Sequence, residues 1–373
     1  PPDVMFIQEE PLPKYADKGL YMDMDPLVER DAAELNLDDF FPGVQEIFMW
    51  DAEAQKVNQG IRYAMPAEGG PTAWFMNLDV FEAAGAKIPE ENGENWTIDD
   101  WVEAMDRIRV LRPDGGLERA GFAIAGLRGA KTSFLWTLSN MEADYLNEDR
   151  TRCTMDSPAS IAAHEVIWKW IFEDRFCPLE GQDMVGLSGV DMFTSGKIGA
   201  QMSGPWYFPQ LRRASTAEGE RLVNWDCFLH PKNSLGNRWT QQSFDGWAIA
   251  SAAPAFKKEP AWSFIRYMLS NEGQARISML GRAMPARPSV AYTDAFNRPD
   301  TPENEDVFIR SMDFAIPQPV TKYWAEMWQI VSKYYDIIYN PQTKDEMTVA
   351  EACQRIAAGV NELLEIGELP TNY

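Results

Sequence analysis

The sequence predicts an α/β fold, and three observations support this class. Short apolar runs that are typical of buried strands alternate along the chain with amphipathic helical segments. The chain has 373 residues, which exceeds what a single hydrophobic core usually holds, so two domains or one two-lobed unit are expected. No internal repeat or long linker divides the sequence. The two lobes are therefore expected to share the chain rather than to follow one another.

Four short apolar runs are predicted to form strands. The first begins directly after Pro1-Pro2-Asp3, with no charged region, apolar signal core or cleavage site before it. A domain that opens on such a strand indicates that upstream sequence is missing. The predicted strands cover residues 4–7, 73–76, 198–202 and 247–250.

Helices are predicted where capping residues precede apolar residues at helical spacing. A Ser or Thr side chain caps the first turn, and an acidic residue three positions later or a proline at the first helical position strengthens the signal. These starts are Thr97 with Asp100, Ser157 with Pro158, and Thr348 with Glu351. The predicted buried stripes are Trp101, Ala104, Met105 and Ile108; Ala163, Val166, Ile167 and Trp170; Ala261, Phe264, Ile265 and Met268; Trp324, Met327, Trp328 and Val331; and Val349, Ala352, Cys353 and Ile356.

Composition excludes several classes of function. The net charge of −23 without a basic stripe disfavours nucleic acids and anionic membranes as partners. No apolar run approaches the roughly 18–20 residues that a membrane-spanning helix needs. Only two histidines, His164 and His230, are present, and neither has a neighbour at metal-ligand spacing. The four cysteines form no CxxC motif; a pair such as Cys153 and Cys177 would be able to bridge in an oxidising compartment.

Motifs of the common nucleotide-binding and metalloprotease sites are absent from the sequence. There is no phosphate-binding loop, no GxGxxG and no HExxH. Gly186-Leu187-Ser188-Gly189 approaches a nucleophile elbow, but its second glycine comes one position early, and a surface loop is the better interpretation. No cofactor, metal or catalytic residue is predicted.

Segments in a consistent order across nearly the whole chain resemble one known family. They are Pro2–Ile7, Tyr15–Leu20, Tyr63–Pro66, Trp74–Phe81, Ala84–Ala86, Trp96–Asp100, Phe193–Ala200, Gly204–Trp206, Gly246–Ile249 and Trp262–Ile265. Each match is weak alone, but the ordered set is specific. The chain thereby resembles the extracellular solute-binding proteins of carbohydrate ABC transporters, the maltose-binding-protein-like family.

The resemblance implies a two-lobed periplasmic-binding-protein type II fold. In that fold the ligand cleft lies between two α/β lobes, and the chain crosses the hinge three times. The implied first lobe comprises residues 1–69 and 249–317, and the second comprises residues 70–248 and 318–373. Family members also have about two strand–helix units before their equivalent of the first strand, which would carry the signal segment absent from this sequence.

The resemblance implies a transport function rather than an enzymatic one. A monomeric protein would capture a sugar or oligosaccharide outside the cytoplasmic membrane, as a periplasmic protein or cell-surface lipoprotein, and deliver it to a permease. Two alternatives remain open: a glycoside hydrolase with an aromatic-lined cleft and two catalytic carboxylates, or the same fold binding a polyol or sugar phosphate.

Candidate site residues follow from the resemblance and from sugar chemistry. Pyranose rings present C–H faces to aromatic rings and hydroxyl rims to carboxylates and amides. The candidates are the aromatic residues Trp206, Trp136, Tyr323 and Trp324 and the polar residues Gln8, Glu9, Glu10, Glu68, Asp245, Arg282 and Arg287. Trp206 is preferred because its Gly-Pro-Trp turn matches the family's stacking position. Core packing is equally consistent with Trp324 and is preferred for Trp247, while Glu9 and Glu10 would serve equally well to solvate a strand end.

One departure from the family pattern concerns the first predicted hinge crossing. Gly69-Gly70-Pro71 follows the Pro66 loop where other residue types are usual. These residues are expected to make the crossing tight, since glycine permits unusual backbone angles and proline fixes one. They also remove side chains that would contact ligand, so the identity of the sugar stays open.

Overall fold

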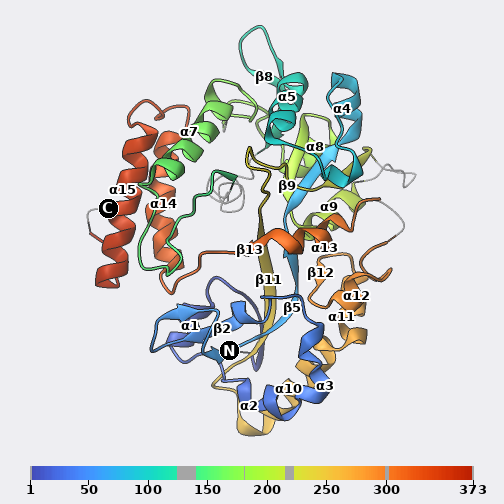
Figure 1. Cartoon of the computed structure of the whole chain (residues 1–373), viewed down its shortest axis with the longest axis vertical. Helices are drawn as coiled ribbons and strands as arrows, with labels where there is room; N and C mark the ends of the chain where they lie inside the picture. The colour runs from blue at the N-terminus through green and yellow to red at the C-terminus, as the bar shows by residue number, and fades with distance from the viewer. Residues whose placement is uncertain (1, 124–139, 180, 215–221, 299–301, 372–373) are drawn as a thin grey trace.

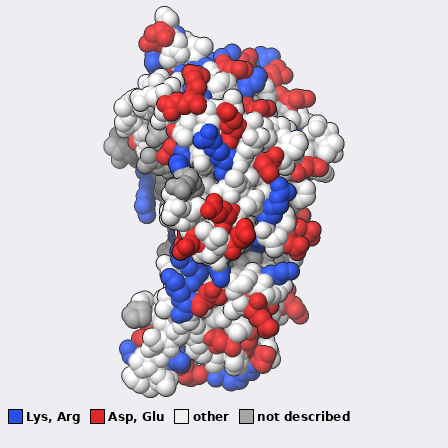
Figure 2. Space-filling model, turned by 90° about the vertical axis from the view of Figure 1, so that its left-hand side faces the viewer, with Lys and Arg blue, Asp and Glu red and all other residues white. Residues whose placement is uncertain are grey.

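The computed structural model describes residues 2–123, 140–179, 181–214, 222–298 and 302–371, and they form an elongated molecule with two main β-sheets (Figure 1). The first sheet lies in the lower half of the view and the second in the upper half. Acidic and basic side chains are interspersed over the face shown in Figure 2. Within the described part of the chain, no helix is long and apolar enough to cross a membrane.

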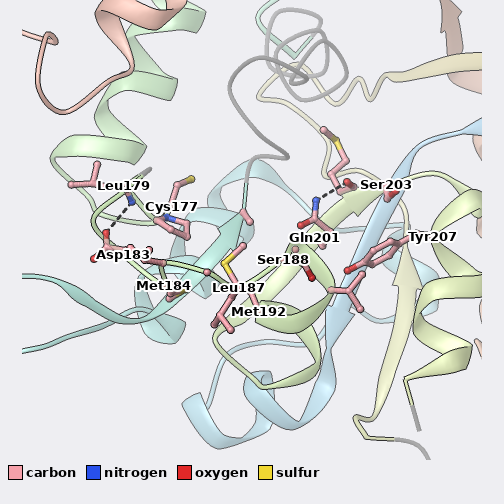
Figure 3. Close-up of a pocket in the computed structure, with 18 of the residues that line it drawn as sticks. Cys177, Leu179, Asp183, Met184, Leu187, Ser188, Met192, Gln201, Ser203 and Tyr207 are labelled. Carbon is pink, nitrogen blue, oxygen red and sulfur yellow. Dashed lines mark hydrogen bonds between the residues drawn. The ribbon is translucent and has the colours of Figure 1, made fainter.

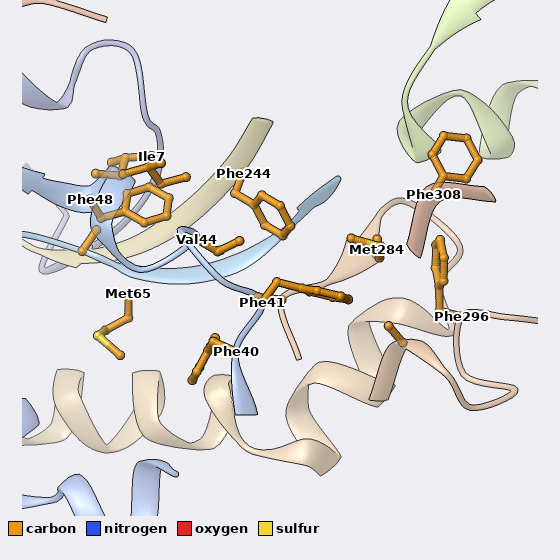
Figure 4. Close-up of a cluster of buried hydrophobic side chains, with 14 of the residues drawn as sticks. Ile7, Phe40, Phe41, Val44, Phe48, Met65, Phe244, Met284, Phe296 and Phe308 are labelled. Atoms are coloured by element: carbon orange, nitrogen blue, oxygen red, sulfur yellow. The ribbon is translucent and has the colours of Figure 1, made fainter. Parts of the chain in front are cut away.

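The first sheet has the order β1-β11-β5-β12, with β13 also paired to β11. All pairs are antiparallel except β11 with β13, which is parallel. The strands are β1 (Val4–Gln8), β5 (Met65–Pro71), β11 (Thr240–Ile249), β12 (Met284–Pro285) and β13 (Ala315–Pro317). A hydrophobic cluster that includes Phe41, Phe48 and Phe244 packs against this sheet (Figure 4).

The second sheet has the order β10-β6-β9-β8-β7. Its strands are β6 (Ala73–Asn77), β7 (Val110–Leu111), β8 (Leu117–Ala123), β9 (Ile198–Ser203) and β10 (Trp225–Phe228). A small third sheet is formed by β2 (Met49–Asp51), β3 (Lys56–Val57) and β4 (Ile61–Arg62).

Helices flank both sheets, and a helical group formed by α7, α14 and α15 lies at one side of the upper half (Figure 1). The helices are α1 (Leu12–Asp17), α2 (Asp25–Arg30), α3 (Ala32–Leu35), α4 (Leu78–Ala84), α5 (Ile98–Ile108), α7 (Pro158–Phe172), α8 (Gly189–Thr194), α9 (Phe208–Arg213), α10 (Ala255–Leu269), α11 (Asn271–Ser278), α12 (Pro288–Ala291), α13 (Val307–Ser311), α14 (Trp324–Ile338) and α15 (Val349–Ile366). Short 3-10 segments cover Leu37–Asp39, Glu46–Phe48, Glu91–Gly93, Pro205–Tyr207 and Met312–Phe314.

The three predicted helix starts are confirmed. Thr97 and Thr348 each accept a hydrogen bond in a reciprocal capping box, and Ser157 accepts one from the Ser160 amide. The stripes of α5, α14 and α15 are buried as expected, whereas Val166 of α7 is only half-buried. Local capping and spacing therefore determine these helices.

Two predictions about elements were wrong in detail. Strand β11 begins at Thr240 rather than near 247, because its first residues are polar yet buried between β5 and β13. In α10, Phe264 is 43% exposed, while Trp262 and Leu269 are fully buried. The Trp262 indole donates a 2.6 Å hydrogen bond to Asp31, which fixes that face of the helix inward.

The four cysteines are buried free thiols. The disulfide between Cys153 and Cys177 that the sequence left open is therefore not formed. The Cys153 amide donates to Asn361 of α15 at 2.7 Å, whereas Cys177 follows α7 and lines a pocket described below. Burial raises the pKa of the Cys153 thiol to about 12, which keeps it protonated and unreactive.

The chain passes from the first sheet to the second through a single residue, Thr72, which lies between β5 and β6. Its hydroxyl lies 2.8 Å from the Thr240 hydroxyl and 3.1 Å from His230 Nε2, and its amide donates to the Thr240 hydroxyl. Because Thr240 begins β11, these hydrogen bonds join the segment between β5 and β6 to the start of β11. The crossing is therefore held by side chains as well as by the β5–β11 ladder.

His164 lies fully buried in the helical group. Its Nε2 lies 2.6 Å from the Tyr335 hydroxyl, which lies 3.1 Å from the Tyr145 hydroxyl, and its Nδ1 lies 2.7 Å from the Ser160 carbonyl oxygen. Burial lowers the pKa of His164 from 6.5 to about 4. The imidazole is thus a neutral structural group at neutral pH.

Acidification is expected to remove a stability contribution that depends on His164. The unfolded chain takes up the proton first, so the contribution is complete above pH 6.5 and is lost as the pH falls towards 4. Between about pH 7.5 and about pH 4.5 the loss should reach ~2 kcal/mol. Chemical denaturation of the wild type and of His164→Gln at both pH values measures it. A variant that loses as much stability as the wild type would contradict this role.

Candidate functional site

Carboxylates gather where strands of the first sheet lie side by side. Asp245 of β11 is paired with Glu68 of β5 on one side and with Gln8 of β1 on the other. Glu9 and Glu10 follow directly after β1. The sheet therefore brings together five of the predicted polar residues, and we refer to these five as the acidic cluster.

Arg282 is the cation of the acidic cluster. Its guanidinium binds the Glu68 carboxylate and donates to Asp245 Oδ2 at 3.0 Å, and it lies 5.3 Å from the centre of the Phe6 ring. Burial, with a smaller contribution from Glu10, raises the pKa of Asp245 to about 6. Arg282 thus neutralises only part of the charge of the cluster.

The structure places Arg287 away from the acidic cluster. The side chain is buried, and its nitrogens donate to the backbone carbonyls of Leu35, Asn36 and Leu269 and to Asp39. Its donors are directed at the protein itself. Met284-Pro285, which lies between Arg282 and Arg287, forms β12. Arg282 contacts the acidic cluster, whereas Arg287 contacts backbone carbonyls.

Glu9 is, together with Glu68, the most buried carboxylate of the cluster, at 3% exposed. Gln318 donates to Glu9 Oε1 at 2.7 Å and to Glu10 Oε1 at 3.2 Å. The second oxygen of Glu9 has no hydrogen-bond partner among the described residues. Burial, and next the charge of Glu10, raise the pKa of Glu9 well above its usual value. Glu9 therefore keeps an unused polar atom.

Sequence reasoning missed two residues beside Glu9. Gln318 and Arg150 line a small gap with Glu9, and Arg150 donates to the carbonyls of Gln318 and Val320. Gln318 lies between two prolines and Arg150 lies in a turn with a positive φ of 57°. Neither belongs to a motif, and only the tertiary structure brings them to Glu9.

Trp206 lies in the predicted turn after β9 and is half-buried. A Cβ atom at Gly204 would lie 2.2 Å from the Trp206 ring, so glycine is required for the ring to fold back over the turn. A Cβ atom at Gly70 of β5 would lie 3.0 Å from Pro205. Since Gly70 is two residues from Glu68, the Trp206 turn and the acidic cluster adjoin the same strand.

The remaining aromatic candidates are dispersed. Tyr323 is half-buried and lines a pocket of about 620 Å³ together with Trp50 and with Arg150, which also lines the gap at Glu9. Trp324 is buried and packs edge-to-face on Trp328 with ring centres 5.6 Å apart. Trp136 lies outside the described residues. Trp247 is half-buried between two phenylalanine rings, Phe6 and Phe264, which agrees with a packing role.

Trp206 also lines the pocket shown in Figure 3, which has a volume of about 670 Å³. Its walls come from the end of β9, from α8 and from the loop before α8.

Ser188 begins α8 with a capping box to Asp191, so the Gly-Leu-Ser-Gly segment is a helix start. Within the described ranges, no group of three or more His, Cys, Asp or Glu residues is arranged to hold a metal ion.

The chain is similar in sequence to bacterial solute-binding proteins. Residues 1–305 match the family model of bacterial extracellular solute-binding proteins. A putative binding protein of Brucella abortus is 21% identical over 305 residues, which are 81% of this chain and 69% of that protein.

Two solved structures share the fold. An ABC substrate-binding protein from Listeria monocytogenes in complex with cycloalternan has a TM-score of 0.80 at 19% identity, covering 98% of this chain and 85% of that one. Maltose-bound MalE3 of T. maritima has a TM-score of 0.75 at 19% identity, covering 97% and 84%. These likenesses confirm the predicted two-lobed α/β fold.

Proposed function

The chain belongs to the family of bacterial extracellular solute-binding proteins, and we propose that it captures a sugar or oligosaccharide and delivers it to the permease of an ABC importer. Proteins of the same fold have been solved with cycloalternan and with maltose, which supports a carbohydrate as the ligand. The family acts outside the cytoplasm. We further propose that the protein is a monomer, either periplasmic or anchored to the membrane by a lipid, and that it catalyses no reaction.

The proximity of Trp206 to the acidic cluster is the observation that carries this proposal. Both features adjoin β5, one offering an aromatic ring and the other carboxylate oxygens. A pyranose stacks its C–H face on such a ring and donates its hydroxyls to such oxygens. The unused oxygen of Glu9 would gain a hydrogen bond from a ligand hydroxyl. The geometry therefore suits a polar ligand with a flat apolar face.

We assign hinge closure to the crossing at Thr72. In the proposal two lobes, predicted as 1–69 with 249–317 and 70–248 with 318–373, close on the ligand, which contacts both lobes only in the closed form. Because β11 pairs with β1 and β5, its residues 240–248 move with the first lobe. A ligand shifts the population towards the state to which it binds more tightly. Closure would bring Trp206 over a sugar that the acidic cluster holds by its hydroxyls.

A thermal-shift screen over a carbohydrate library tests the proposed function. A ligand at about 100 times its Kd adds about 2.7 kcal/mol to the stability of the folded state, so at least one sugar should raise the Tm clearly. Sugar phosphates should fail, because the acidic cluster repels anions. Polyols belong in the same library.

Two results of this screen would contradict the proposal. If no sugar raises the Tm, the carbohydrate ligand must be abandoned. If the sugar recovered after incubation is cleaved, as chromatography would show, the protein is a glycoside hydrolase and not a transport protein.

A further inference from the structure

The walls of the pocket beside Trp206 carry several apolar side chains, unlike the acidic cluster. Met184, Leu187 and Met192 come together from the loop before α8 and from α8 itself, as Figure 3 shows. Met202 and Ile171 complete the wall on the side of the sheet and α7. Methionine and aliphatic side chains of this kind adapt to varied apolar groups.

Three polar side chains of this pocket are engaged within the protein. Asp183 accepts hydrogen bonds from the Leu117 and Leu179 amides and from Arg175. Ser188 is bonded to Asp191, and the Gln201 amide donates to the Met202 carbonyl at 3.0 Å. A sugar ring buried here would leave several hydroxyls without partners, which is costly. Asp183, Ser188 and Gln201 therefore have little hydrogen-bonding capacity left for a pyranose.

Tyr207 differs from these three side chains. Its side chain is 6% exposed, and its hydroxyl has no hydrogen-bond partner among the described residues. Edge-to-face contacts with Phe75 and Phe193 fix the ring, and Figure 3 shows the hydroxyl directed towards the Ser188 side of the pocket. Burial raises the pKa of Tyr207, so the hydroxyl stays a donor. A ligand acceptor at this point would satisfy it.

The rim of the pocket is apolar as well. Val185 is 72% exposed and Leu187 is 41% exposed, side by side on the loop before α8. Exposed apolar side chains around a pocket are typical of binding sites. Trp206 forms another part of the wall, so the pocket is continuous with the ring proposed to stack on the sugar.

We propose that this pocket receives an apolar substituent of the carbohydrate, an aryl or branched alkyl group with one hydrogen-bond acceptor for Tyr207. The inference rests on the proposed function, because it places the sugar on Trp206 and the substituent behind it. The ligand class is then a glycoside with an apolar aglycone rather than an unsubstituted oligosaccharide.

Matched glycosides test the pocket. Methyl and 4-nitrophenyl pyranosides of the same sugars, glucosides and galactosides in both anomeric forms, are compared by calorimetry. The nitrophenyl member should bind at least about tenfold more tightly because it buries an aromatic ring. Leu187→Gln and Met192→Gln should abolish this preference. Tyr207→Phe should lower nitrophenyl affinity about fivefold and leave methyl glycosides unchanged.

Met279→Gln is the matched control, since Met279 is 63% exposed and lies outside the pocket. Circular dichroism verifies that each variant folds, and Leu187→Gln changes only a rim residue. Equal affinities within the glycoside pairs would overturn the pocket proposal while leaving the carbohydrate function intact.

A neutral fluorescent probe, N-phenyl-1-naphthylamine, separates the two possible failures because it needs no sugar. Probe binding that is lost in Leu187→Gln and Met192→Gln supports an apolar site. If the probe binds but no glycoside does, the carbohydrate function is contradicted. The proposal that the pocket receives an aglycone is then contradicted as well. If the variants bind the probe as the wild type does, the pocket proposal is overturned.

Discussion

Replacing Trp206 by alanine is expected to weaken carbohydrate binding by about 1–3 kcal/mol, or roughly tenfold to more than a hundredfold in Kd. Trp206 is half-buried, so part of the residue stays accessible to a ligand. The Gly204 position and Pro205 against Gly70 hold the ring in place. A pre-positioned aromatic ring loses little entropy on binding, which makes it a strong anchor.

Calorimetry with the sugar identified by the thermal-shift screen measures this effect. Trp206→Phe keeps a stacking ring and should retain most of the affinity. Trp168→Ala is a matched control, because Trp168 is also a half-buried tryptophan but packs on Phe172 and Lys344 away from the site. Unchanged affinity in Trp206→Ala would mean that Trp206 serves packing alone.

Replacing Gly69 by alanine is expected to destabilise the protein by about 3 kcal/mol or more. A Cβ atom there would lie 2.2 Å from the Ser243 carbonyl oxygen and 2.6 Å from Phe244 Cα, which are backbone atoms of β11 that cannot yield. The two strands would have to separate at the crossing between the sheets. The close approach of β5 and β11 at Gly69 thus explains the tight crossing expected from Gly69-Gly70-Pro71.

Urea denaturation of Gly69→Ala and of Gly189→Ala provides the comparison. A Cβ atom at Gly189 would meet only Gln201 Oε1 at 3.7 Å, an ordinary contact, so this control should be near neutral. If Gly69→Ala is as stable as the control, β5 and β11 tolerate a wider spacing than the structure has.

Elements that depend on neighbouring residues in sequence were predictable. Thr97, Ser157 and Thr348 cap their helices because each side chain reaches an amide in its own first turn. The start of β11 was not predictable, since the burial of Thr240 depends on its bonds to Thr72 from a distant segment. The inward face of α10 was missed for the same reason, because Trp262 is held by Asp31.

The candidate site divides in the same way. Glu9 and Glu10 were named from their place after the first predicted strand, and Glu68 and Asp245 were named from the family resemblance. The pairing of Arg282 with Glu68 and Asp245 and the contact of Gln318 with Glu9 join segments far apart in the chain. Arg287 shows the converse, because an arginine beside a strand looks the same in sequence whether it faces ligand or backbone carbonyls.

The sequence by itself determined the α/β class, the capped helices and the order of family segments, because capping and periodicity act within a few residues. Tertiary structure alone decided which carboxylates keep unused oxygens, where the aromatic rings lie, and that an apolar pocket adjoins Trp206. Burial and hydrogen bonding at these positions depend on strands and loops that are remote in sequence, and no local pattern records them.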